Sequence, residues 1–144
     1  MKLTILLIED NPADIRLMLE ILRESEVPHD FHIATDGEEG LQFLRKAPPF
    51  ESRPSPDIIF LDLNLPKVDG REVLKEVKED PALRRIPVVV MSTSEAPEDV
   101  TLAYNHYANC FITKPSDVAE FTRVAEMING FWLRIARLPS NDSR

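Results

Sequence analysis

Short apolar runs that alternate with amphipathic segments restrict the fold of this 144-residue chain more than any other feature. Residues 3–8 (LTILLI) and 86–91 (IPVVVM) are apolar almost throughout, and so are residues 57–61 (DIIFL) after their first position. Strands without polar alternation are buried on both faces, which is typical of a parallel sheet covered by helices.

The order of these segments predicts one α/β domain. The expected strands are residues 3–8, 31–34, 57–61, 86–91 and 109–113. The expected helices are residues 12–22, 37–46, 71–79, 97–107 and a last helix that Ser116 or Asp117 caps. Five strands and five helices in this length predict a flavodoxin-like, doubly wound five-stranded parallel sheet of order 2-1-3-4-5.

The first expected helix begins with a capping sequence. Asn11 is a favoured N-cap residue, Pro12 suits the first helical position, and Asp14 suits the positive end of the helix dipole. The spacing i, i+3, i+4, i+7 predicts a core-facing stripe of Ile15, Met18, Leu19 and Leu22. Leu17 and Ile21 lie off this stripe, so we expect them to form an exposed docking surface for a partner.

Composition and charge exclude several classes of protein. The net charge of −8 argues against nucleic-acid binding, because phosphate backbones are bound by Lys and Arg. No apolar run approaches the roughly 20 residues of a membrane span, and the N-terminal MKLTILLIED turns acidic too soon for a signal peptide. Cys110 is the only cysteine, so no internal disulfide can form and we expect a cytoplasmic protein.

Polar residues follow four of the expected strands where each strand ends. They are Glu9 and Asp10, Asp62, Ser92, and Lys114. The carboxyl ends of parallel strands meet at one edge of a sheet, so these side chains should converge. Three carboxylates with intrinsic pKa values of about 4 repel one another and need a cation, and oxygen ligands favour Mg²⁺. Lys114 and the Ser92 hydroxyl would then suit phosphoryl oxygens, and Asp62 is the candidate nucleophile.

The same residues allow other interpretations. Taken alone, Asp62 could cap the turn after its strand, and Ser92 could simply begin a loop. A flavodoxin-type cofactor site would need a hydroxyl- or glycine-rich loop where this chain has EDNPAD. A haloacid-dehalogenase-type phosphatase would have an aspartate two residues after its nucleophile, where this chain has Asn64.

Together the motifs resemble the receiver domain of two-component response regulators. They are the acidic pair Glu9-Asp10, FLDLNLPKVDG around Asp62, PVVVMSTS around Ser92, and Lys114-Pro115. By this resemblance, Asp62 accepts a phosphoryl group from the phosphohistidine of a sensor histidine kinase. The chain would then be a phosphoacceptor and not an enzyme, except that it supports its own Mg²⁺-dependent phosphorylation and autodephosphorylation.

The resemblance also implies roles for the residues around Asp62. Asp10, Asp62 and the backbone oxygen of Asn64 would bind Mg²⁺, with Glu9 acting largely through water. Ser92 and Lys114 would hold the phosphoryl oxygens, and a cis peptide bond would join Lys114 to Pro115. Phe111 matches the aromatic switch residue that moves with Ser92. Thr93 replaces a smaller residue and would narrow the entrance to the site.

The C-terminal part of the chain bears on output. We expect a receiver domain over residues 1–138 and a tail over residues 139–144 without an effector domain, so that signalling would occur through protein contacts. The sequence resembles the response regulators paired with phytochromes of cyanobacteria and other bacteria. The alternatives are a shuttle to a histidine phosphotransfer protein and a chemotaxis-like regulator.

The last expected helix has more apolar residues than one buried face requires. Its predicted core-facing stripe is Val118, Phe121, Ala125, Ile128, Trp132 and Ile135. A second stripe consists of Val124, Met127 and Phe131. We therefore expect a homodimer through the fourth helix, fifth strand and fifth helix, with Phe131 and Trp132 buried. Gly130 could instead break the helix, since glycine costs about 1 kcal/mol inside one.

Overall fold

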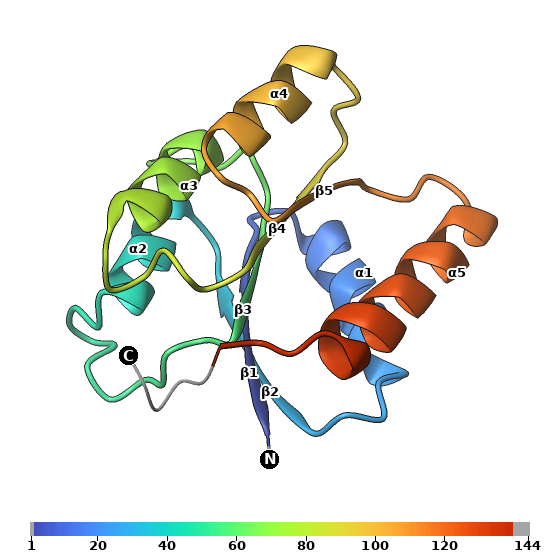
Figure 1. The fold of residues 1–144 in the computed structure, drawn as a ribbon, viewed down its shortest axis with the longest axis horizontal. Coiled ribbons are helices and arrows are strands. Elements are labelled where there is room, and N and C mark those ends of the chain that lie inside the picture. Colours follow the sequence, from blue (N-terminus) through green and yellow to red (C-terminus); the bar gives the residue numbers. More distant parts are fainter. Residues whose placement is uncertain (1, 140–144) are drawn as a thin grey trace.

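A computed structural model describes residues 2–139 and has the predicted α/β architecture (Figure 1). The strands run in parallel in the order β2-β1-β3-β4-β5. They are β1 (Leu3–Ile8), β2 (His29–Ala34), β3 (Ile58–Leu61), β4 (Val88–Ser92) and β5 (Cys110–Thr113). The helices are α1 (Pro12–Arg23), α2 (Gly37–Leu44), α3 (Gly70–Glu79), α4 (Pro97–Asn105) and α5 (Val118–Met127), which continues as the π-helix η1 (Ile128–Ile135). The predicted fold class is confirmed.

The sheet separates two apolar clusters. Helices α1 and α5 cover one face, and helices α2, α3 and α4 cover the other (Figure 1). Along β3, Ile58 and Phe60 belong to the cluster beneath α1 and α5, whereas Ile59 and Leu61 belong to the opposite cluster. All four side chains are at most 1% exposed, as expected for a central strand buried on both faces. None of the described helices is long and apolar enough to cross a membrane.

The strand register places the carboxyl ends of the central strands together. Ile8 at the end of β1 pairs with Leu61 at the end of β3, and Leu61 pairs with Val90 in β4. At the far side of β4, Ser92 pairs with Thr113. The residues that directly follow β1, β3 and β5 therefore emerge at the same edge of the sheet.

The rotation of α1 about its axis differs from the prediction. Met18 and Leu22 are buried as expected, but Ile21 is fully buried and Leu19 is 44% exposed. Ile21 is therefore wrong as a docking residue, while Leu17 is partly buried and lines a surface groove. Six of the twelve residues of α1 are Leu, Ile or Met, so the pattern allows two neighbouring rotations. Packing against the C-terminal helix selects one of them, and the Asn129 side chain donates a hydrogen bond to the Ile21 carbonyl (2.8 Å).

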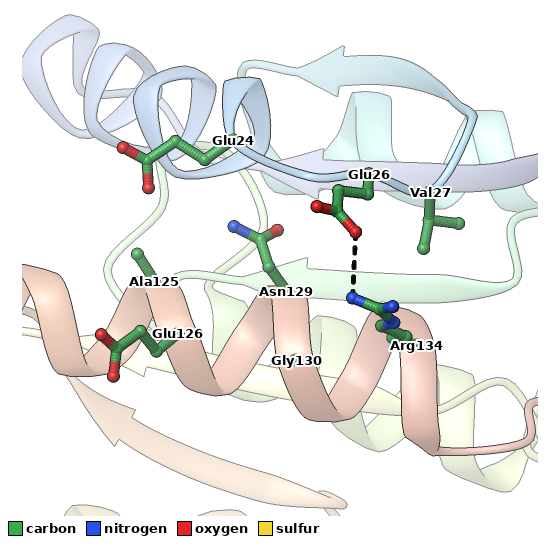
Figure 2. Close-up of a pocket in the computed structure, with 8 residues that line it drawn as sticks. All are labelled: Glu24, Glu26, Val27, Ala125, Glu126, Asn129, Gly130 and Arg134. Atoms are coloured by element: carbon green, nitrogen blue, oxygen red, sulfur yellow. Dashed lines mark hydrogen bonds and ion pairs between the residues drawn. The ribbon is translucent and has the colours of Figure 1, made fainter.

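The C-terminal helix is not broken at Gly130 but changes to π-helical geometry. The buried residues change with it, because a π-helix has i→i+5 hydrogen bonds and more residues per turn than an α-helix: Ile128 is followed by Leu133, and both are buried. The prediction that Val118 and Ile135 face the core is wrong, because their side chains are 81% and 71% exposed. In Figure 2, Asn129 and Arg134 face the end of α1, where Arg134 forms an ion pair with Glu26 (3.0 Å).

Candidate functional site

Three carboxylates converge at the ends of β1 and β3. Glu9 and Asp10 follow β1, Asp62 follows β3, and one oxygen of each lies within 4.8 Å of the others. Glu9 and Asp62 are buried (2% and 7% exposed), whereas Asp10 is exposed. Such a set of oxygen donors, open to solvent on one side, fits Mg²⁺, which prefers carboxylates and retains several water ligands. The predicted cofactor is supported by this geometry.

Lys114, directly after β5, is the buried cation of this cluster. Its Nζ donates hydrogen bonds to Glu9 Oε1 and to Asp14 Oδ2, both at 2.8 Å, and lies 3.6 Å from Asp62 Oδ2. The sequence does not predict the contact with Asp14, because the position of Asp14 indicates only a local role in the first turn of α1. Its partner is 100 residues away, and no sequence signal joins the two.

Burial and charge shift the ionisation of this cluster. Burial raises the pKa of Glu9 to about 7, and the nearby Asp62 charge acts in the same direction, against the hydrogen bond and charge of Lys114. Burial acts to lower the pKa of Lys114, but the hydrogen bonds to Asp14 and Glu9 outweigh it, so the pKa is raised. Lys114 is thus charged at neutral pH and offsets part of the repulsion among the carboxylates.

Ser92 is the last residue of β4, which lies beside the strand that Asp62 follows. Its side chain is fully buried, and its Oγ accepts a hydrogen bond from the Ser94 amide (3.1 Å). Phe111 on β5 is partly buried against the cluster beneath α3 and α4, and its amide donates to the Tyr104 hydroxyl (3.2 Å). Thr93 is exposed.

The loop that carries Asp62 folds back tightly on the start of α3. The Gly70 amide donates to the Leu63 carbonyl (2.9 Å), and a Cβ on Gly70 would lie only 2.1 Å from the Asp62 backbone oxygen. Asn64 lies in this loop and is exposed, so its role as a backbone ligand stays a prediction.

One expectation about the site is wrong. Among the described residues the cis peptide bond is Pro48–Pro49, so the bond between Lys114 and Pro115 is trans. The trans form is the ordinary state of an X-Pro bond.

Comparison with known proteins decides the family. Residues 5–126 match the model of the response regulator receiver domain. The chain belongs to this family. The match includes the acidic cluster, Ser92 and Lys114, and it confirms the resemblance that the motifs indicated.

Relatives of similar length are known. The chain is 44% identical over 136 residues to response regulator Rcp1 of Synechocystis sp., covering 94% of this chain and 92% of Rcp1. The Mn²⁺-bound form of Rcp1 superposes with a TM-score of 0.91 at 43% identity, covering 96% of this chain and 99% of Rcp1. The phosphorylated cyanobacterial phytochrome response regulator RcpA gives a TM-score of 0.92 at 47% identity, covering 97% and 100%.

The residues predicted for a dimer differ in exposure. Phe131 is 47% exposed, whereas Trp132 is partly buried against the cluster beneath α1 and α5. The two rings make an edge-on contact, with centroids 5.4 Å apart. Trp132 therefore packs within its own domain, whereas about half of the Phe131 side chain is exposed. The expected tail at residues 139–144 lies, except for Pro139, outside the described residues.

Proposed function

We propose that Asp62 accepts a phosphoryl group from the phosphohistidine of a sensor histidine kinase and that the phosphorylated domain signals through protein contacts. The P–N bond of the donor breaks, and a P–O bond to an Asp62 carboxylate oxygen forms. The observation that carries this proposal is the position of Asp62, buried between two further carboxylates and Lys114.

The surrounding side chains support this chemistry. Glu9, Asp10, Asp62 and the Asn64 backbone oxygen would hold Mg²⁺, which supplies positive charge to the transferring group when bound. Lys114 Nζ uses two of its three donors on Glu9 and Asp14, so one donor remains for a phosphoryl oxygen. The Ser92 hydroxyl would donate to a second oxygen, and Phe111 would move with it. The same groups would support Mg²⁺-dependent autodephosphorylation, with Thr93 at the entrance.

Transfer from the kinase tests the proposal directly. The protein and the Asp62→Asn variant are each mixed with candidate kinases, phytochromes first, and radiolabelled ATP. We expect label on the unchanged protein and none on the variant. Equal label on both proteins would refute Asp62 as the acceptor.

We further propose that the kinase is a bacterial phytochrome, as the similarity to RcpA supports, in preference to a phosphorelay shuttle or a chemotaxis-like role. A groove of about 330 Å³ beside the site offers a docking surface. Its lining consists of Leu17, Pro115, Ser116, Asp117, Val118 and Phe121. This groove joins the start of α5 to Leu17 of α1, and Leu17 also lines the small pocket that contains Asp62 and Lys114.

The Leu17→Lys variant should slow phosphorylation by the kinase about tenfold, because a charge would enter the apolar docking groove. Phosphorylation by acetyl phosphate, which needs no docking surface, should be slowed much less, although Leu17 also lines the pocket around Asp62. Leu19→Lys is the matched control, since Leu19 lies on the same helix and does not line the groove. Equal rates for both variants would contradict the docking proposal.

The chain is also proposed to form a homodimer through α4, β5 and α5. Exposed apolar side chains on these elements and on η1 support this, namely Tyr104, Val118, Phe131 and Ile135. We expect sedimentation velocity at tens of micromolar to give a dimer and the Phe131→Glu variant to give a monomer. A monomer for the unchanged protein, with and without beryllofluoride, would contradict the proposed dimer.

A further inference from the structure

The loop between β4 and α4 is fixed by side-chain hydrogen bonds next to Ser92. The Ser94 hydroxyl donates to Asp99 Oδ2 (2.6 Å) and accepts from the Ala96 amide (3.2 Å). The Ser94 amide in turn donates to Ser92 Oγ (3.1 Å). Ala96, the N-cap residue of α4, has no side chain that can cap the helix. Ser94 and Asp99 therefore tie this loop to the first turn of α4.

Asp99 is also bound from the neighbouring helix α3. Arg71 Nη2 donates to Asp99 Oδ1 at 2.9 Å, and Arg71 Nη1 contacts Asp69 Oδ1 (3.3 Å) and the Leu63 carbonyl (3.4 Å). The Arg71 and Asp99 side chains are 29% and 22% exposed, so solvent screens this pair only partly. Helices α3 and α4 lie side by side on the same face of the sheet (Figure 1).

The ionisation of these groups agrees with a formed pair. Hydrogen bonds from Ser94 and then from Arg71 lower the pKa of Asp99. The hydrogen bond to Asp99, followed by that to Asp69, raises the pKa of Arg71 against the effect of burial.

These contacts form a continuous chain from the residue after Asp62 to the Ser92 hydroxyl. It runs from the Leu63 carbonyl through Arg71, Asp99 and Ser94. The Ser92 hydroxyl is fully buried and is held by the Ser94 amide, so we expect the end of β4 or the loop to rearrange when this hydroxyl binds a phosphoryl group on Asp62. The bonds of the chain tie this loop to α4 and α3 in the arrangement that the structure shows.

We propose that Arg71, Asp99 and Ser94 are positioning residues that hold the Ser92 hydroxyl in its resting place and thereby set how readily the site accepts a phosphoryl group. This rests on the proposed phosphorylation of Asp62. Loosening the contacts removes stabilisation from the resting arrangement alone, so it favours the phosphoryl-bound arrangement. The predicted effect is a higher affinity for a phosphoryl mimic, whereas damage to a merely structural contact would lower that affinity.

The test measures the dissociation constant of beryllofluoride, a phosphoryl mimic, by calorimetry in the presence of Mg²⁺. Asp99→Asn, Arg71→Met and Ser94→Ala should each bind about fivefold more tightly than the unchanged protein. The double variant of Arg71 and Asp99 should bind no more tightly than either single variant, because both changes break the same pair. The matched control is Arg45→Met, which breaks the Arg45–Glu76 pair of equal length (2.9 Å) between α2 and α3 and should leave binding unchanged.

A second arm tests whether the effect acts through the hydroxyl. In a Ser92→Ala background, Asp99→Asn should no longer tighten binding. The dissociation constant of Arg71→Lys, which keeps the charge, should lie between those of Arg71→Met and the unchanged protein. Arg71→Lys also replaces Arg71→Met in the test if the larger change prevents folding.

The outcomes separate the two proposals. Equal or weaker binding by the folded variants, or a gain that persists without the Ser92 hydroxyl, would overturn the positioning role alone. No binding by the unchanged protein would overturn the proposed function and the positioning role with it. Asp62→Asn, which should not bind, confirms that the readout reports on this site.

Discussion

Gly70→Ala is expected to lower the free energy of unfolding by about 3 kcal/mol and to suppress phosphorylation of Asp62. The added Cβ would lie 2.1 Å from the Asp62 backbone oxygen and 2.6 Å from Leu63 Cα. These are backbone atoms of the two buried residues that directly follow β3, so the clash cannot be relieved by turning a side chain. The backbone that carries the acceptor must move, and a small displacement of a reacting group is costly for group transfer.

Gly130→Ala is the matched control for this change. A Cβ on Gly130 meets no atom within 4 Å, and the residue lies within the C-terminal helix. Alanine loses less backbone entropy than glycine on folding, so we expect the free energy of unfolding to rise by about 0.5 kcal/mol. Phosphorylation should be normal. Urea unfolding of both variants, with labelling by acetyl phosphate, measures the two effects. Similar effects of the two substitutions would contradict the close approach of Gly70 to Asp62.

Lys114→Met should cost about 3 kcal/mol of stability and should slow phosphorylation more than tenfold. The substitution removes the cation that bonds to Glu9 and Asp14 and faces Asp62. Glu9, only 2% exposed, would keep its carboxyl group in a buried site without that partner. The loss of a donor for a phosphoryl oxygen would slow transfer independently.

Two further variants separate these contributions. Lys2→Met removes an exposed ion pair with Asp30 (3.4 Å) and should change stability by less than about 0.5 kcal/mol. The double variant Lys114→Met, Glu9→Gln also replaces the Glu9 carboxyl group that has lost its partner, so it should recover stability without recovering phosphorylation. If the double variant were as unstable as Lys114→Met, the buried carboxylate would not be the source of the cost. Urea unfolding and acetyl phosphate labelling measure both properties.

The sequence alone is sufficient to predict the strands and the polar residues at their ends. Central strands such as Ile58–Leu61 are apolar on both faces, and a parallel sheet brings the residues that follow them to one edge. The sequence alone therefore places Glu9, Asp62 and Lys114 together. The Arg71–Asp99 pair joins two helix starts 28 residues apart, and no periodicity or motif indicates it.

The helices were predicted less well, for physical reasons. In α1, apolar residues on neighbouring faces leave its rotation open, and packing around Ile21 decides it. At the C-terminus, the α-helical spacing drifts out of register because η1 has more residues per turn than an α-helix, so Leu133 is buried and Ile135 is exposed. A change from α- to π-helical geometry has no simple signature in the sequence.

Identification of the modified residue tests the central claim most directly. The protein is incubated with acetyl phosphate and Mg²⁺ and treated with borohydride, which reduces an acyl phosphate to an alcohol, and its peptides are then sequenced by mass spectrometry. We predict conversion at Asp62 alone, dependent on Mg²⁺ and absent from Asp62→Asn. Conversion at Glu9, Asp10 or another carboxylate, or none at all, would contradict the account.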